Sequence, residues 1–367
     1  MLIKFAVKNF RGFAERIEWD LSHPSNYSFN TYAIKDGVVK NGIIYGPNGS
    51  GKSNLALAIF DIENHLSAKW KKTDYYSNFV YTGNPNSPVE FEYVFKFDND
   101  ILEYHYSKNS VGLLVAESLI VNNKQVFIRN QSVFEIDDEQ FKVDATVKEN
   151  FKQNVNSVSV INFLTASYPF PQDHYIVKLI LFVNSMLWFK NLDSREFIGL
   201  ETATFSLEEF IIQNKYVNDF SEFLAKVSEQ HFKFVPPKEG DKHLFCEIGN
   251  NTILFQTITS TGTTALELLY VWIKRMSVAS FVFIDEFDAF YHFKLAFEVC
   301  KQLFNLNCQV FTSSHNTYLM TNDLLRPDCL FLLQDNKIKP LQACTNKELR
   351  FGHNIEKIYR SGAFQVE

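Results

Sequence analysis

Residues 46–53 are the feature of this sequence that most constrains its fold. They read Gly-Pro-Asn-Gly-Ser-Gly-Lys-Ser, after an apolar run at 41–45 that predicts a strand and before apolar residues that recur at helical spacing from Asn54. The glycines let successive backbone N–H groups point at one anion, and the start of the helix adds its dipole. Lys52 is placed to reach the β- and γ-phosphates of a nucleotide, and the Ser53 hydroxyl to hold Mg²⁺. The sequence thus predicts a phosphate-binding loop made of Gly46, Pro47, Asn48, Gly49, Ser50, Gly51, Lys52, Ser53 and Asn54.

A second motif supplies two acids. The apolar run 280–284 ends in Asp285 and Glu286, and such a run is typical of a central parallel strand. Asp285 would emerge at the carboxyl end of that strand, where it can reach a metal ion beside Ser53. Glu286 is placed to polarise an attacking water as a general base. Two acids after a strand can also simply begin a turn, but a phosphate-binding loop in the same chain favours the catalytic interpretation.

Two further segments are candidates for nucleotide contacts. His315 follows a predicted strand at 309–312 and would lie near the same sheet edge, where it can hydrogen-bond a γ-phosphate, although a lone histidine is often structural. Residues 259–263, Thr-Ser-Thr-Gly-Thr, precede a helix predicted over 264–276. Ser260 and Gly262 could bind an anion at that helix start or act as ordinary caps.

The remaining chain divides by pattern. Alternation over residues 2–10 predicts a strand, and two hairpins over 89–106 and 113–129 predict an antiparallel sheet. The pattern turns helical from 165 to 230, until Pro236-Pro237 marks a boundary. Within it, the apolar stretch 175–189 predicts a buried helix, since a membrane span needs about twenty residues.

Composition excludes several other classes of protein. The net charge of −6 gives no bulk attraction to nucleic acid or to an anionic membrane, although a local basic patch remains possible. The five cysteines form no CxxC pair, so neither a disulfide framework nor a zinc site is indicated. We therefore expect a cytoplasmic protein that does not associate with membranes.

Taken together, the motifs resemble the ABC-type ATPase heads of the SMC, RecF and OLD-like group. They occur in the family order, at residues 9–13, 46–53, 259–263, 281–286, 288–289 and 315. Residues 285–292 and 349–364 look like the stand-alone ATPases of bacterial phage-defence (abortive infection) operons. The resemblance implies an α/β fold of the P-loop NTPase class, with a central mostly parallel sheet, an antiparallel β subdomain and an inserted α-helical lobe. The expected domains are 1–160 and 241–367 for the ATPase head and 161–240 for the lobe.

The resemblance also implies a mechanism. Two heads would pair head-to-tail as a homodimer that sandwiches two ATP molecules with Mg²⁺, and a larger assembly is possible. Ser260 and Gly262 of one subunit would face the phosphate loop of the other. Arg11 would lie near the nucleotide, and Asp288 would couple the two sites. The implied catalytic residues are Lys52, Glu286 and His315, and the implied metal ligands are Ser53 and Asp285.

This chain departs from the family pattern in two places. Thr261 and Thr263 stand where the family prefers Gly and Gln, which implies slow hydrolysis or a different contact between subunits. For the Q-loop glutamine, which the family places near the nucleotide, Gln172 is the candidate. The lobe is too short for a long coiled coil and is more consistent with a docking platform.

The preferred hypothesis for function is an ATP-dependent sensor or scaffold that controls an effector encoded in the same operon, such as a nuclease or toxin. One alternative is a DNA-binding repair ATPase of the RecF or SMC kind, with a basic lane to which Lys69, Lys71 and Lys72 around Trp70, or Lys4 and Lys8, would contribute. A third is a transporter nucleotide-binding subunit, which the opening strand, the hairpins and the C-terminal tail fit poorly.

Overall fold

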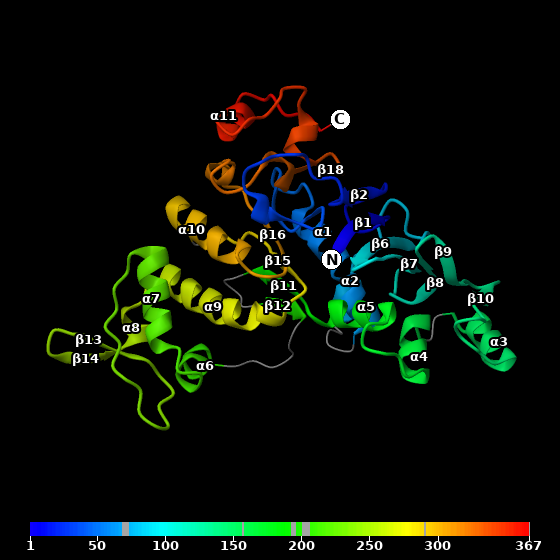
Figure 1. Cartoon of the computed structure of the whole chain (residues 1–367), viewed down its shortest axis with the longest axis horizontal. Coiled ribbons are helices and arrows are strands. Elements are labelled where there is room, and N and C mark those ends of the chain that lie inside the picture. Colours follow the sequence, from blue (N-terminus) through cyan, green and yellow to red (C-terminus); the bar gives the residue numbers. More distant parts are fainter. Residues whose placement is uncertain (68–72, 156–157, 192–195, 200–205, 290, 367) are drawn as a thin grey trace.

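The structure is a computed structural model that describes residues 1–67, 73–155, 158–191, 196–199, 206–289 and 291–366. Its framework is a pair of seven-stranded sheets with helices packed around them (Figure 1). One sheet carries the strands that precede the predicted site residues, and the other is the predicted antiparallel subdomain.

The central sheet is parallel in its middle and antiparallel at both edges. Its middle strands β5, β15 and β16 are buried on both faces, which explains their continuous apolar runs. Because these three strands are parallel, their carboxyl ends lie at one edge of the sheet. In spatial order the strands are β12 (Glu196–Gly199), β11 (Met186–Asn191), β15 (Phe281–Ile284), β16 (Gln309–Ser313), β5 (Asn41–Tyr45), β17 (Leu330–Gln334) and β18 (Lys337–Pro340).

The second sheet is antiparallel throughout and confirms the predicted meander. Its two tight turns place Asp98, Asn122 and Asn123 at positive φ, the backbone that two-residue hairpin loops require and that Asn and Asp tolerate. The strand order is β10 (Phe134–Ile136), β9 (Lys124–Arg129), β8 (Leu114–Val121), β7 (Asp100–Lys108), β6 (Val89–Phe97), β1 (Leu2–Lys8) and β2 (Ile17–Asp20).

Two kinds of contact join the sheets. The Trp19 ring lies 4.6 Å from the Phe311 ring, centroid to centroid, and 5.4 Å from that of Phe331. The Gln309 side chain accepts from Leu2 N at 2.7 Å and donates to Leu2 O at 2.9 Å. Strand β1 is therefore fixed to the start of β16, and the antiparallel sheet extends to the right of the central sheet in Figure 1.

Helices and short hairpins complete the described fold. The 15-residue α9 begins at Thr261, three residues earlier than predicted, so most of the segment 259–263 belongs to its first turn. The helices are α1 (Lys52–Ile59), α2 (Asp61–Leu66), α3 (Ala145–Gln153), α4 (Val160–Ser167), α5 (Tyr175–Asn184), α6 (Leu207–Gln213), α7 (Val217–Ser228), α8 (Phe255–Ile258), α9 (Thr261–Arg275), α10 (Phe293–Phe304) and α11 (Ile355–Arg360). The hairpins are β3 (Ile34–Lys35) with β4 (Val38–Val39), and β13 (Phe245–Ile248) with β14 (Asn251–Leu254). Within the described ranges, no helix combines the length and apolar character that a membrane crossing needs.

The prediction of one buried helix over 175–189 is correct only for the first part of that stretch. The apolar stretch 175–189 forms α5 and then, after Ser185, the strand β11, which pairs in parallel with β15. A buried helix and a buried strand share the same apolar composition, so periodicity alone could not separate them. The inserted segment is therefore not only a helical lobe, because it also supplies one edge of the central sheet; the domain bounds themselves remain a prediction.

A buried ion pair anchors the junction between β9 and α4. The side chains of Arg129 and Glu117 are both fully buried, and their N–O distance is 2.9 Å. Glu117 also accepts from the Tyr104 hydroxyl at 2.7 Å and from Val160 N at 2.9 Å. The guanidinium of Arg129 donates to Val158 O at 2.8 Å. Loss of either charge would leave its partner without compensation in the interior.

We expect Arg129→Met to lower the free energy of unfolding by about 3 to 5 kcal/mol, because Glu117 would stay buried without its cation. Urea denaturation followed by circular dichroism measures this change. The matched control is Arg16→Met, which removes an exposed ion pair with Glu18 and Glu92 and should cost less than about 1 kcal/mol. Equal losses in the two variants would contradict the role of the buried pair.

Candidate nucleotide-binding site

In the loop between β5 and α1, two glycine positions have no room for a side chain. A Cβ added at Gly46 would lie 2.4 Å from Leu333 O and 2.6 Å from Ser50 Oγ. Gly51 has φ +101°, and a Cβ there would lie 2.8 Å from the Phe13 ring. Gly49 also has positive φ, at +77°. The loop therefore keeps its shape only with glycine at these positions.

Polar groups inside the loop are arranged to receive an anion. The α1 helix has Gly51 as its N-cap and thus no capping side chain for its first N–H groups. Lys52 is 6% exposed, and its Nζ donates to Gly46 O at 2.9 Å and to Pro47 O at 3.1 Å. Burial lowers the pKa of Lys52, while Asp285 and Glu286 oppose the shift. Among the described residues, the buried Ser50 Oγ has no hydrogen-bond partner. These features fit a phosphate group.

Asp285 and Ser53 form the oxygen pair that a hard cation would need. Asp285 is 3% exposed at the end of β15. Burial raises the pKa of Asp285, and hydrogen bonds from Ser313 and Ser53 oppose that rise. The Ser313 hydroxyl donates to Asp285 Oδ1 and accepts from Glu286 N at 2.8 Å. Carboxylate and hydroxyl oxygens suit Mg²⁺, which typically takes one or two protein ligands besides phosphate oxygens and water.

Glu286 and His315 are exposed at the same sheet edge. Glu286 adopts φ +44°, a conformation uncommon for a residue with a side chain, and the bond from its N–H to Ser313 helps to hold it there. The segment that carries His315 is tied to β5, because Ser314 N donates to Ile44 O at 3.1 Å. The Ser314 hydroxyl donates to Asp288 at 2.7 Å. Burial raises the pKa of Asp288, and the bond from Ser314 opposes the rise.

Arg11 belongs to a loop that packs on the phosphate-binding loop through a different residue. Phe13 is the neighbour of Gly51, whereas the Arg11 guanidinium donates to Tyr75 O at 3.2 Å. Its carbon also lies 5.8 Å from the centre of the Tyr75 ring. Burial lowers the pKa of Arg11. Asn54 packs near Gly12, whose added Cβ would lie 3.4 Å from Asn54 Nδ2. A contact between Arg11 and nucleotide stays a prediction.

The segment 259–263 lies apart from the phosphate-binding loop. Ser260 is the N-cap of α9 and accepts from Thr263 N at 3.2 Å, while Gly262 lies within the first turn. The Thr263 hydroxyl donates to Gln230 at 3.2 Å, just beyond α7. In Figure 1, α7, α8 and the start of α9 lie at the left, away from α1. The start of α9, to which Ser260 and Gly262 belong, is thus distant from α1 in this view.

The end of strand β11 lies beside the two acids, and the sequence had not indicated this. Asp285 N donates to Phe189 O at 3.0 Å, so the strand ends beside the acidic pair with Lys190 and Asn191. The polar pair that follows the apolar run could have indicated the end of a strand, but the run was interpreted as a helix. The Q-loop candidate Gln172 lies instead in the exposed turn before α5. The sequence likewise indicated no role for Ser313 and Ser314.

Of the lysines considered for a DNA lane, Lys4 and Lys8 belong to the described residues, and both lie near acidic side chains. Lys4 Nζ lies 3.4 Å from Glu18 and 3.9 Å from Asp20, and Lys8 Nζ lies 3.6 Å from Glu90. These acids offset the two cations. Lys69, Lys71 and Lys72, with Trp70, lie outside the described residues.

The mixed α/β fold and the glycine-rich loop between β5 and α1 are consistent with a P-loop NTPase. Residues 43–321, well over half of the chain, match the model of a family described as "AAA domain, putative AbiEii toxin, Type IV TA system". The chain belongs to this family and is an AAA-type ATPase domain of the abortive-infection kind.

Comparison with solved structures finds heads of SMC proteins. The SMC head domain from Thermotoga maritima is 14% identical with a TM-score of 0.45, and the match covers 92% of this chain and 97% of that one. The Smc head domain with a coiled coil and joint from Pyrococcus yayanosii is 11% identical with a TM-score of 0.46, covering 98% and 99%. No curated protein matches the sequence.

We expect Gly46→Ala to weaken ATP binding by at least about tenfold, because the added methyl group meets Leu333 O and Ser50 and must deform the loop. Fluorescence titration with a labelled ATP analogue measures the dissociation constant. Gly352→Ala is the matched control, since a Cβ there meets nothing within 4 Å. Unchanged affinity in Gly46→Ala would show that the loop does not hold the nucleotide.

Proposed function

We propose that this protein binds Mg²⁺ and ATP, hydrolyses ATP, and pairs head-to-tail with a second copy of itself around the nucleotide. The observation that carries this proposal is the meeting of three strand ends at one sheet edge. There a glycine-shaped loop with Lys52 and Ser53 lies beside Asp285, with Glu286 and His315 exposed next to it. The family of AAA domains to which the chain belongs supports the same function.

Each residue has a distinct proposed role. Lys52 exchanges the carbonyls of Gly46 and Pro47 for the β- and γ-phosphate oxygens, an exchange favoured by the opposite charge of the phosphates. Ser53 and Asp285 hold Mg²⁺, which when bound neutralises charge on the phosphates. Glu286 orients a water molecule and accepts its proton as the γ-phosphate is attacked. His315 donates a hydrogen bond to the γ-phosphate.

A second copy would complete the site. Ser260 and Gly262 begin a long helix whose first N–H groups can bind a phosphate only if another chain presents one. Thr263 is buried and its hydroxyl is bonded to Gln230, so it contributes little to such a contact. Turnover is therefore expected to be slow, and ATP binding rather than hydrolysis would hold the dimer together.

In the cell we propose a cytoplasmic sensor or scaffold that holds an operon-encoded effector, such as a nuclease or toxin, in defence against phage. The abortive-infection family supports this role. The effector chemistry would belong to that partner. A DNA-binding repair role finds less support, because Lys4 and Lys8 are paired with acids and the net charge is −6.

Glu286→Gln should slow ATP turnover by about a hundredfold or more, because the amide cannot accept the proton of the attacking water. The variant should still bind ATP and accumulate as a dimer. Light scattering coupled to size-exclusion chromatography measures the mass, and phosphate release measures turnover. The contrasting variant is Lys52→Ala, which should stay monomeric with ATP. Unchanged turnover in Glu286→Gln would refute the role of Glu286, and ATP-independent dimers of Lys52→Ala would indicate a constitutive scaffold.

A further inference from the structure

The C-terminal tail, residues 349–364, packs on the segment that follows His315. That segment forms the short 3-10 turn η4 (Thr317–Leu319), which contacts α11 of the tail. The Thr317 hydroxyl donates to Glu356 Oε1 at 2.8 Å. Arg360 lies 2.7 Å from the same carboxylate oxygen and also reaches the Thr317 hydroxyl at 3.3 Å. A residue two positions beyond His315 is thus bonded to a charged pair in the tail.

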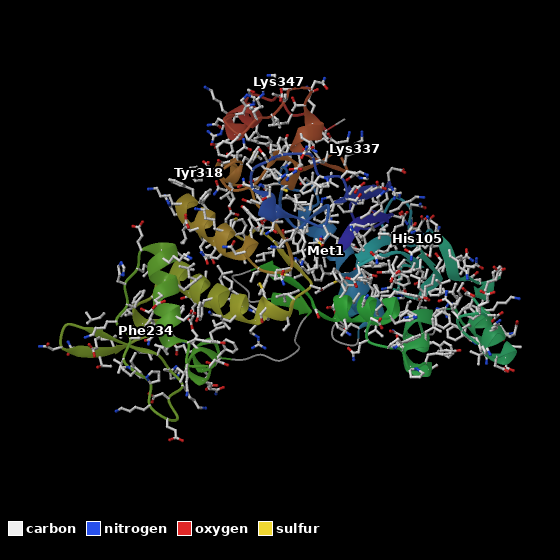
Figure 2. The ribbon with its side chains drawn as sticks, viewed as in Figure 1. Met1, His105, Phe234, Tyr318, Lys337 and Lys347 are labelled. Atoms are coloured by element: carbon white, nitrogen blue, oxygen red, sulfur yellow. The ribbon has the colours of Figure 1, made fainter. Side chains whose placement is uncertain are left out.

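The other side of His315 is fixed to the catalytic edge. Ser314 bonds Asp288 at 2.7 Å and accepts from Asn316 N at 2.9 Å. The Asn316 side chain accepts from Tyr318 N at 3.1 Å and so caps η4 (Tyr318 is labelled in Figure 2). His315 therefore lies between two anchors, Asp288 on one side and Glu356 on the other, while its own imidazole is exposed.

The tail is itself held firmly enough to act as an anchor. The Asn322 side chain donates to the carbonyls of Arg350 and Phe351, each at 3.0 Å. Ile355, at the start of α11, is buried, and Asn354 caps the helix by accepting from Lys357 N at 2.8 Å.

We propose that Glu356 is a positioning residue that sets the location of His315 at the γ-phosphate through Thr317. This inference rests on the proposed ATP hydrolysis and deepens it, because it gives the tail a role in the reaction. The Glu356 carboxylate restrains the backbone that follows His315 and does not itself contact the substrate, whereas the His315 imidazole does. Anything that displaces the tail would then alter hydrolysis without touching the nucleotide.

The test compares Glu356→Ala with Glu348→Ala in the full chain. Glu348 immediately precedes the tail and pairs with Arg350 of the tail at 2.6 Å, but both side chains are exposed. We expect Glu356→Ala to lower kcat on the order of tenfold, as a small displacement of a catalytic group does, and to leave the ATP dissociation constant within about twofold. Glu348→Ala should leave both constants unchanged. Thr317→Val should reproduce the loss, and Thr317→Ser, which keeps the hydroxyl, should restore turnover.

A double variant separates positioning from a general loss of structure. In the His315→Ala background, Glu356→Ala should cause no further decrease in kcat, since the group that it positions is already absent. Additive losses would overturn the inference, as would equal kcat in Glu356→Ala and the wild-type protein. Wild-type protein that binds and hydrolyses no ATP would overturn the proposed function and this inference together, so the two failures are distinguishable.

Discussion

Three parallel strands ending at one edge are the constraint on which the site depends. Strand β16 lies between β5 and β15, with Thr312 opposite both Ile43 and Ile284. Since all three strands are buried on both faces, a shift in the register of one strand would expose or misplace all of its apolar side chains. The loop after β5, the acids after β15 and the segment after β16 therefore emerge together, although more than 250 residues of chain separate the first of them from the last.

Two of the polar side chains at that edge are already hydrogen-bonded within the protein. Lys52 bonds the loop carbonyls, and Asp285 accepts hydrogen bonds from Ser313 and Ser53, which offset part of the cost of its burial. Nucleotide binding would thus replace hydrogen bonds within the protein by hydrogen bonds to the phosphates. At the tail, likewise, the Thr317 hydroxyl donates a hydrogen bond to the Glu356 carboxylate, which also forms an ion pair with Arg360.

The sequence predicted the elements whose residues carry a local signal. Strands β5 and β16 and the first hairpin were predicted with nearly correct bounds, because their apolar patterns and turns are unambiguous. Strand β11 was missed, because a run of apolar residues before Lys190 is compatible with either helix or strand and only tertiary pairing with β15 decides. For the same reason, two hydrogen bonds could not be predicted. Ser313 and Asp285 are 28 positions apart, and Thr317 and Glu356 are 39 positions apart.

Isothermal titration calorimetry of ATP into the full-length protein, with Mg²⁺ present, tests the central claim most directly. The account predicts saturable heat with one nucleotide per chain, and loss of that heat when magnesium is replaced by a chelator. Absence of any nucleotide uptake, by the protein alone and by the protein with its operon partner, would contradict the assignment of residues 46–53 and 285 to a nucleotide site.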